Sequence, residues 1–401
     1  MRQRERPPWK QPVKAALTNP EGGAPAAAET HVEGMSPRDE ESPFYVPSVP
    51  HILGGLVHRH RSLWLWLGRL ETSVLAHELQ SISVKMPIYV CGLARSGSTL
   101  LHEIISSHPH VATHRMKDYP MVFTPYWWRR ATAGQRPQAP RERPHRDKMM
   151  ITSESPDAIE EMVWMAFFPK CHDPSVCQVM ASGDKHPAFE SFYQAHLRKL
   201  LLAEGATRYA AKANYHVARL PYLAHLFPDA RFLIPVRAPA GHIASLMRQH
   251  QWFSEGHRKH MRALAYMQRS GHFEFGLDRR PMNLGDRERV RKIFRAWGEG
   301  EEVRGWAMSW DMVYGYLARL LASESPVRAA ALVVRFETMC AAPVETLRAV
   351  AEHCVLPDAE RLVERHAPGI HVPAYYQSHF SADELAVIRE ETAATAALWG
   401  Y

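Results

Sequence analysis

The sequence lacks an apolar run long enough to cross a membrane, since a spanning helix needs about 20 consecutive apolar residues. The longest candidate, SLWLWLGRL at residues 62–70, has about half that length and is followed by Glu71, His77 and Glu78. Its pattern predicts an amphipathic helix packed against the core, with an interfacial membrane helix as the less favoured alternative. The basic N-terminal stretch is not followed by the apolar segment of a secretory signal. We therefore expect a soluble, cytoplasmic protein without a transmembrane segment.

Cysteine is also scarce, and its few positions are scattered along the 401 residues. This usage suits a reducing compartment better than a disulfide framework. One pair has a histidine beside it, but the four ligands at regular spacing that define a structural zinc site are missing. We therefore expect no metal. The residues concerned are Cys91, Cys171, His172, Cys177, Cys340 and Cys354.

Large aliphatic side chains are almost absent from the first 45 residues, which are rich in Pro, Ala, Glu and Arg. Such a segment cannot bury enough apolar surface to offset its ordering entropy. We expect a flexible leader over residues 1–45 and a single domain over 46–401. The 46% hydrophobic content of the chain is enough for a large core.

Positive charge exceeds negative charge, with 49 Lys and Arg against 42 Asp and Glu and a formal net charge of +7. An excess of this size points to an anionic partner, such as a nucleotide, a phosphorylated or sulfated molecule, nucleic acid or an acidic membrane. The most basic run, residues 129–148, is rich in Pro and Gln without interleaved aromatic residues. It predicts a solvated loop and not a nucleic-acid surface.

Short apolar segments alternate with helical patterns along the chain. Strands separated by helices form a parallel sheet with helices on both faces. The expected class is therefore α/β, with helical insertions over residues 251–325, where no strand is expected. Strands are expected at 86–92, 207–214, 230–237 and 330–337, and helices at 98–109, 217–227, 241–250 and 342–354.

The segment GLARSGST at residues 92–99 lies between the first expected strand and its helix. A glycine-rich turn in this position presents backbone N–H groups to an anion. The nucleoside-triphosphate version reads GxxxxGK[ST], but here Ser98 replaces the lysine and Arg95 is the only fixed charge of the loop. The loop therefore lacks the lysine with which an ATP-dependent kinase binds the β- and γ-phosphates. The structural alternative is a turn in which Ser98 caps the helix.

A second segment, ARFLIPVRAPAGHIASLMRQH at 230–250, places Arg237 at the end of a strand and Ser245 eight residues later. With the Arg-Ser-Gly-Ser-Thr loop before it, this order resembles the sulfotransferases that use 3′-phosphoadenosine 5′-phosphosulfate (PAPS), closer to their bacterial and Golgi-type branch than to the cytosolic phenol enzymes. The resemblance implies a P-loop-type three-layer sandwich and no metal. It also implies that the loop holds the 5′-phosphosulfate, while Arg237 and Ser245 hold the 3′-phosphate through charge-assisted hydrogen bonds. The implied donor-binding residues are Arg95, Ser96, Gly97, Ser98, Thr99, Leu100, Arg237 and Ser245.

The family resemblance extends more loosely to other segments and covers about residues 86–120 and 207–355. YAAKANYHVARL places Lys212 at a strand end, which implies a contact with the leaving oxygen of the donor. VVRFE at 333–337 resembles a structural segment of the family. The C-terminal Arg-Lys-Gly segment of the cytosolic enzymes is missing, and His371 or His379 are candidates to replace it over the 3′-phosphate.

Sulfuryl transfer also needs a general base, because the acceptor hydroxyl loses a proton as it attacks in line with the leaving oxygen. Asp118 lies in the region where protein-tyrosine sulfotransferases carry a glutamate base, although their Gly-Glu-Glu motif is missing here. Glu160 begins a helix with an apolar stripe and ranks equally, because burial would raise its pKa. Glu161 and His114 remain alternatives.

The resulting hypothesis is a PAPS-dependent sulfotransferase with Arg95, Asp118, Glu160 and Lys212 as catalytic candidates. The acceptor is a hydroxyl-bearing small molecule, sugar, lipid or peptide, and a homodimer is compatible with the sequence. The rivals are a non-catalytic nucleotide- or anion-binding protein and, less favoured, an ATP-dependent P-loop kinase. An aromatic cluster is a candidate wall of the acceptor pocket, with core packing as its alternative. Its members are Phe123, Tyr126, Trp127 and Trp128.

Overall fold

The structure is a computed structural model that describes residues 42–135, 139–147, 149–372 and 380–401. The part from Ser42 to Tyr401 forms one compact unit. Of the expected leader, residues 1–41 lie outside the described residues.

A five-stranded sheet lies at the centre of this unit, with the strand order β2-β5-β1-β6-β7. Every pair of neighbours in it is parallel, as the alternation of strands and helices predicted. β1 is the middle strand, and the carboxyl ends of all five strands lie along one edge. The strands are β1 (Ile88–Val90), β2 (Val111–Ala112), β5 (Arg208–Lys212), β6 (Arg231–Val236) and β7 (Ala331–Arg335).

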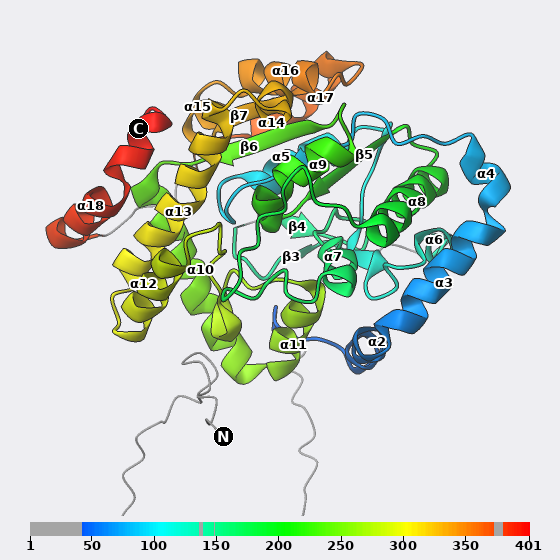
Figure 1. Cartoon of the computed structure of the whole chain (residues 1–401), viewed down its shortest axis with the longest axis horizontal. Coiled ribbons are helices and arrows are strands. Elements are labelled where there is room, and N and C mark those ends of the chain that lie inside the picture. The colour runs from blue at the N-terminus through cyan, green and yellow to red at the C-terminus, as the bar shows by residue number, and fades with distance from the viewer. Residues whose placement is uncertain (1–41, 136–138, 148, 373–379) are drawn as a thin grey trace, which may run out of the picture. The chain divides into compact units, whose positions relative to one another are not determined.

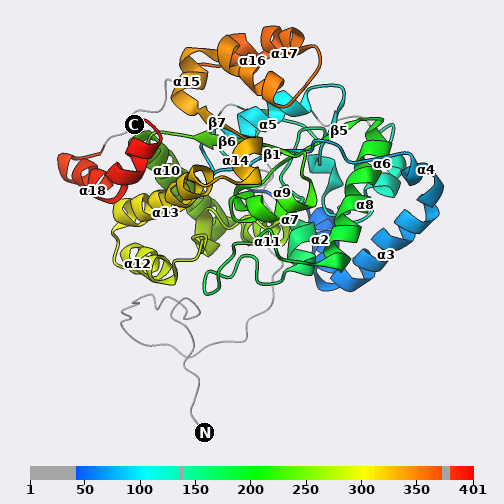
Figure 2. The ribbon, with the colours of Figure 1, turned by 45° about the horizontal axis from the view of Figure 1, so that its top comes forward.

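Helices cover both faces of the sheet, which gives the expected three layers (Figures 1 and 2). Alternate residues of β1 belong to two separate cores, since Ile88 and Val90 face one side while Tyr89 faces the other. The core behind Val90 is closed by α5 (Ser98–Ser106), α15 (Phe336–Ala341), α16 (Pro343–His353) and α17 (Ala359–His366). The larger core around Tyr89 is closed by α7 (Glu161–Phe167), α8 (Pro187–Glu204), α9 (Leu220–Leu226), α13 (Glu302–Ala322) and α14 (Pro326–Ala330).

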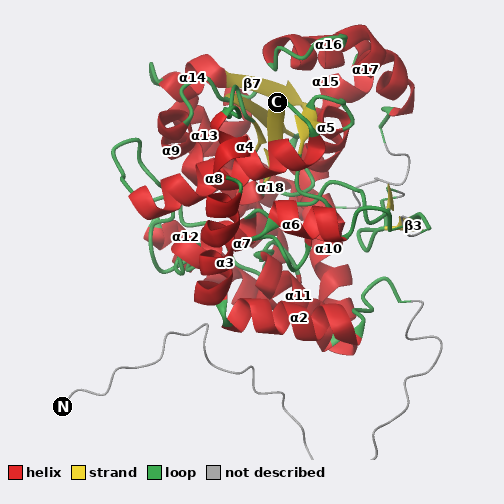
Figure 3. Cartoon of the chain, turned by 90° about the vertical axis from the view of Figure 1, so that its right-hand side faces the viewer, coloured by secondary structure: helices red, strands yellow, loops and turns green. Residues whose placement is uncertain are grey.

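The other elements surround these layers, and Figure 3 shows the strands as a small group among helices. The range 251–325 contains helices and no strand among the described residues, as expected. A two-stranded hairpin, β3 (Arg141–Glu142) with β4 (Met150–Ile151), stands apart from the central sheet. The other helices are α2 (Ser48–Arg59), α3 (Arg61–Val74), α4 (Ala76–Gln80), α6 (Pro125–Ala131), α10 (Pro239–Lys259), α11 (Met261–Ser270), α12 (Arg287–Gly298) and α18 (Ala382–Leu398).

The α3 helix differs from its prediction in orientation. Residues 62–70 are helical as expected, and α3 packs against α8. Its buried positions are Gly68 and Glu71, whereas Leu63, Trp66 and Leu70 are exposed. Glu71 turns inward because the ammonium of Lys199 on α8 lies 2.8 Å from its carboxylate. No helix in the described ranges has the length and apolar character needed to cross a bilayer.

Candidate active site

The loop between β1 and α5 is shaped by two glycines. A side chain at Gly92 would place its Cβ 2.9 Å from the carbonyl oxygen of Pro235, so glycine lets β1 and β6 approach closely. Gly97 has φ 97°, a left-handed value that favours glycine. The Ser96 hydroxyl donates to the carbonyl of Leu93 at 2.7 Å and closes the turn. No described side chain caps α5, which begins at Ser98, so the alternative of a Ser98-capped turn is not what forms. The amides of this helix N-terminus are therefore available to an anion.

The segment after β6 packs directly on this loop. Arg237 is buried, and its Nη1 donates to the carbonyl oxygen of Arg95 at 3.2 Å. The Ser245 hydroxyl, from α10, accepts a hydrogen bond of 3.3 Å from Nε of Arg95. His242 Nε2 lies 2.8 Å from the carbonyl oxygen of Ala94. The two segments that were predicted to bind opposite ends of one nucleotide therefore face the same crevice at the carboxyl edge of the sheet.

The VVRFE segment at 333–337 spans the end of β7 and contacts Arg237 and the start of α10. The ring of Phe336 lies under the guanidinium of Arg237, 4.5 Å from centroid to Cζ. Glu337 accepts a 3.0 Å hydrogen bond from the backbone N–H of Ala238 at the start of α10. These contacts fix the direction of Arg237, in keeping with a structural role for the segment. His371 is exposed, and His379 lies outside the described residues.

Lys212 lies at the end of β5, where its Cα pairs with that of Val90 on β1. Burial lowers the pKa of its ammonium group, and Glu274 is the nearest compensating charge. Among the described residues, none forms a hydrogen bond or ion pair with this ammonium. A partly buried cation beside this glycine-rich loop is suited to bind a negatively charged ligand.

In this structure Arg95 of the loop forms an ion pair with an acidic side chain, that of Asp147. Arg95 Nη1 lies 2.7 Å from Oδ2 of Asp147, and Arg143 Nε donates to Oδ1 of the same carboxylate at 2.8 Å. Burial alone would raise the pKa of Asp147, but Arg143 and Arg95 hold it well below its usual range. The segment is fastened by Trp252, whose Nε1 donates to the carbonyl of Pro144 at 2.6 Å. The prediction of a solvated loop over 129–148 is therefore wrong for this part, because its charges pack on the crevice.

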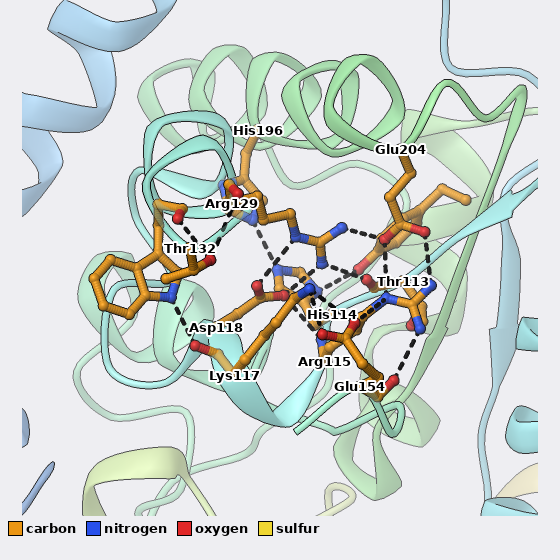
Figure 4. Close-up of polar contacts among 12 residues, drawn as sticks. Thr113, His114, Arg115, Lys117, Asp118, Arg129, Thr132, Glu154, His196 and Glu204 are labelled. Atoms are coloured by element: carbon orange, nitrogen blue, oxygen red, sulfur yellow. Dashed lines mark hydrogen bonds and ion pairs between the residues drawn. The ribbon is translucent and has the colours of Figure 1, made fainter. Parts of the chain in front are cut away.

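Asp118 lies in a buried ion-pair network, shown in Figure 4. Its Oδ1 accepts from Nε of Arg129 at 3.0 Å, and its Oδ2 accepts from the backbone N–H of Arg115 at 2.8 Å. Arg129 also pairs with Glu204 on α8 and donates to the carbonyl of Thr113 at 2.7 Å. Both oxygens of Asp118 are thus used to hold α6 and the chain after β2. These contacts favour a structural role for Asp118, and its role as the general base stays a prediction.

Glu160 is buried. Its Oε1 accepts from Trp164 Nε1 at 2.7 Å and from the Tyr193 hydroxyl at 2.8 Å, while its Oε2 accepts from the Tyr209 hydroxyl. Burial raises its pKa, as the sequence suggested, and these hydrogen bonds oppose the shift. Tyr209 comes three residues before Lys212 on β5, which is about 10 Å along the strand. Glu160 is thus bonded to the middle of the core and not to the crevice.

The two remaining candidates are also enclosed. Glu161 pairs with Arg219 and lies 2.9 Å from His172 Nε2, so its pKa is held low although burial opposes this. His114 has Nε2 at 2.9 Å from a second imidazole, that of His196, and burial lowers its pKa to about 4. Neither side chain reaches the donor loop.

Glu161, Cys171 and His172 lie close enough together to share a metal ion, with ligand atoms within 4.8 Å of one another. Arg219 already supplies a cation to this carboxylate through both of its oxygens. A second positive charge at the same oxygens would be repelled, so we assign no metal to the cluster.

A carboxylate that sequence reasoning missed, Glu274, lines a pocket beside the donor loop. The pocket walls include Leu93 and Ala94 of the loop and Asn214, two residues after Lys212. Glu274 accepts a hydrogen bond from Asn214 Nδ2 and lies 3.6 Å from His272 Nδ1. Burial alone would raise the pKa of Glu274, but the charges of His272 and Lys212 together lower it to about 2. No spacing motif marks this residue, because only the tertiary fold brings it to the loop.

The same pocket is walled by Trp297 and Trp306, whose ring centroids are 5.1 Å apart. The aromatic cluster proposed from the sequence lies elsewhere, around α6. Phe123 is buried in the core, and Trp128 Nε1 donates to the carbonyl of Lys117 at 2.6 Å. None of the four residues of that cluster lines the pocket.

Comparison with known proteins adds an independent finding. The sequence profile described as "Sulfotransferase family" matches residues 87–360, more than half of the chain. A search of curated proteins finds no significant match. Among solved structures, sulfotransferase STF9 from Mycobacterium avium is 15% identical, with 89% of this chain and 87% of that chain covered and a TM-score of 0.48. Sulfotransferase STF1 from Mycobacterium tuberculosis H37Rv is 14% identical, with 86% and 87% covered and a TM-score of 0.47.

Proposed function

The chain belongs to the sulfotransferase family, as its two anion-binding segments suggested, and we propose that it transfers a sulfuryl group from PAPS to an acceptor hydroxyl. The observation that carries the proposal is the contact of Arg237 and Ser245 with Arg95. A nucleotide with phosphates at both ends needs two anion-binding groups on one crevice. The contact supports this arrangement because it brings Arg237 and Ser245 next to Arg95 of the loop. An ATP-dependent kinase would need a lysine at position 98, where the chain has serine.

The proposed donor site uses the loop for the 5′-phosphosulfate. Arg95 and the amides of Gly97, Ser98, Thr99 and Leu100 would bind its oxygens, since they gather at the N-terminus of α5. The hydroxyls of Ser98 and Thr99 are further donors.

Two other groups of the donor site act differently. The hydroxyl of Ser96 holds the turn, so only its amide faces the ligand in this proposal. Arg237 and Ser245 would bind the 3′-phosphate, with Ser245 exchanging its contact to Arg95 for a phosphate oxygen.

In the proposed reaction, the acceptor oxygen forms a bond to sulfur as the bond from sulfur to the bridging oxygen breaks. The 5′-phosphate of the nucleotide leaves with the electron pair, and Lys212 neutralises the charge that develops on it. Glu274 takes the proton of the acceptor hydroxyl. It is ionised at neutral pH because its pKa of about 2 lies far below, and the bound donor would raise its basicity by neutralising the neighbouring cations.

The acceptor would bind against the pocket that Glu274 lines, which has a volume of about 30 Å³ and has to widen before it holds more than a water-sized group. Trp297 and Trp306 give it flat apolar walls, and Arg280 adds a cation. This surface suits the face of a ring or a sugar in a hydroxyl-bearing small molecule.

All five cysteines are free thiols, which supports a reducing compartment such as the cytoplasm.

The first test of the proposal is the variant Arg237→Ala. We expect it to bind 3′-phosphoadenosine 5′-phosphate about 10- to 100-fold more weakly, because a charge-assisted bidentate contact is worth about 1.5–3 kcal/mol. Isothermal calorimetry with this nucleotide and with ATP measures the effect. Arg231→Ala, at the opposite end of β6, is the matched control and should bind normally. Tighter binding of ATP, or unchanged affinity in a folded Arg237→Ala protein, would remove the 3′-phosphate site from the proposal.

A second test uses Asp147→Asn. We expect about five- to tenfold tighter binding of the same nucleotide, because the variant removes a carboxylate that competes with an incoming anion for Arg95. Glu288→Gln, an exposed carboxylate on α12, is the control and should change nothing. Weaker binding by Asp147→Asn would show instead that Asp147 holds Arg95 in its binding position.

A further inference from the structure

The outer faces of α2 and α3 expose large apolar side chains. Trp66 is 55% exposed and Val49 is 66% exposed, although both lie in well-formed helices. The positions recur at intervals of three and four residues, so each helix carries one stripe. Single exposed apolar residues are normal on a protein surface, but a run of them along two successive helices marks an interaction site. We call this set the α2–α3 face: Val49, Ile52, Leu56, Leu63, Trp66, Leu70 and Val74.

The exposed charge of the same helices has one sign. Between residues 48 and 74 the only carboxylate is Glu71, which is fully buried against Lys199. Arg59 and Arg69 are exposed, and Arg61 is partly exposed. The surface therefore combines apolar stripes with arginines and offers no acidic group to an incoming partner.

We propose that α2 and α3 dock this protein on an anionic lipid surface. Trp66 and its apolar neighbours would enter the boundary between headgroups and acyl chains, while Arg59 and Arg69 would meet the lipid phosphates. α3 and α4 lie outside α8 and contact it, whereas α2 precedes α3 and packs beside α11 (Figure 1). This orientation leaves the stripes uncovered by the rest of the described residues. The proposal is independent of the proposed reaction.

Charge argues against a second copy of the chain as the occupant. A two-fold dimer through the α2–α3 face would place the same patch on itself, because such an interface is self-complementary. Arg59 and Arg69 of both copies would then approach each other without a carboxylate on either face. An anionic membrane supplies the missing charge.

The first 14 residues of the chain fit the same partner, whereas residues 1–41 as a whole carry six Lys and Arg against seven Asp and Glu. The only branched aliphatic residues in 1–41 are Val13, Leu17 and Val32, which are too few to cover seven apolar side chains. The first 14 residues contain five cations and one carboxylate, Glu5. This positive segment would be attracted to the same lipids as the helices.

The test is co-sedimentation of the full-length protein with vesicles of phosphatidylcholine alone or with about 30% phosphatidylglycerol, a content high enough to give a negative surface potential. We expect binding to the anionic vesicles to be at least about tenfold stronger and to weaken as salt increases. The triple variant Leu63→Ser, Trp66→Ser, Leu70→Ser should lose about tenfold or more of this affinity. Arg59→Gln and Arg69→Gln should each lose up to about fivefold.

Leu277→Ser with Leu398→Ser is the matched control, because both side chains are exposed and lie outside α2 and α3. It should bind vesicles normally, and circular dichroism should show that every variant is folded. Three results would overturn the proposal. These are equal affinity of the triple variant and the parent, a parent dimer in solution that becomes monomeric in the triple variant, and vesicle binding that is lost after Leu17→Ser with Val32→Ser, which would assign the binding to the N-terminal segment.

Discussion

The variant Glu274→Gln should lower the rate of sulfuryl transfer by about 10²- to 10⁴-fold, the usual contribution of a general base. Binding of 3′-phosphoadenosine 5′-phosphate should stay nearly unchanged, since glutamine keeps the size of the side chain and can still face Asn214. Single-turnover kinetics with labelled PAPS and a panel of phenols, sugars, lipids and peptides would measure the rate. Calorimetry with the nucleotide product would measure binding.

The controls for this variant are the carboxylates that the sequence favoured. Asp118→Asn weakens a buried ion pair with Arg129, so we expect a loss of about 3 kcal/mol in the free energy of unfolding and near-normal turnover of the folded protein. Glu160→Gln keeps hydrogen bonds to Trp164 and the tyrosines and should also turn over. If Glu160→Gln lost turnover with intact nucleotide binding while Glu274→Gln remained active, the base would be Glu160.

Replacement of Lys212 by methionine should lower the turnover at saturating PAPS by about 10²- to 10³-fold. Methionine fills a similar volume but cannot neutralise the charge on the leaving phosphate. Lys212→Arg should recover part of the rate because the charge is restored. Lys292→Met, on α12, is a matched control and should behave as the parent. A variant that binds nucleotide more weakly but keeps its turnover would instead make Lys212 a ground-state binding group.

The same lysine predicts a pH dependence. Burial lowers the pKa of Lys212 below its ordinary value of 10.5, and only the charged form attracts the donor. Affinity for the nucleotide should therefore fall as the pH rises through this lowered pKa, earlier than for an exposed lysine. Lys212→Arg should abolish this loss, because arginine stays protonated. An alkaline loss that persists in Lys212→Arg would belong to another group.

The sheet and the loop between β1 and α5 could be predicted from the sequence because their signals are local. A buried apolar strand, two glycines and an amphipathic helix lie within residues 86–109, so the loop follows from neighbouring residues. The position of Arg237 follows in the same way, since it ends a strand that the apolar run defines. Parallel strands then bring both segments to one edge.

The predicted bases illustrate what local patterns could not reveal. The identity of a buried carboxylate's partner depends on tertiary packing, as with Asp118 and Glu204, which share Arg129 although they are far apart in the sequence. Glu274 reaches the crevice from the helical insertion, whose sequence carries no catalytic spacing. The inward turn of Glu71 depends in the same way on Lys199.

If Arg95 binds the donor as proposed, its contact with Asp147 would also affect selectivity among anions. A carboxylate tethered by a short segment competes at a fixed effective concentration that does not depend on how much protein is present. Free sulfate or phosphate has a single anionic group and must displace Asp147 from Arg95 without any further contact to the protein. A nucleotide that also engages Arg237 gains a second attachment and can displace it. The segment that carries Asp147 would thus weaken the binding of abundant inorganic anions to Arg95 more than it weakens the binding of the nucleotide donor.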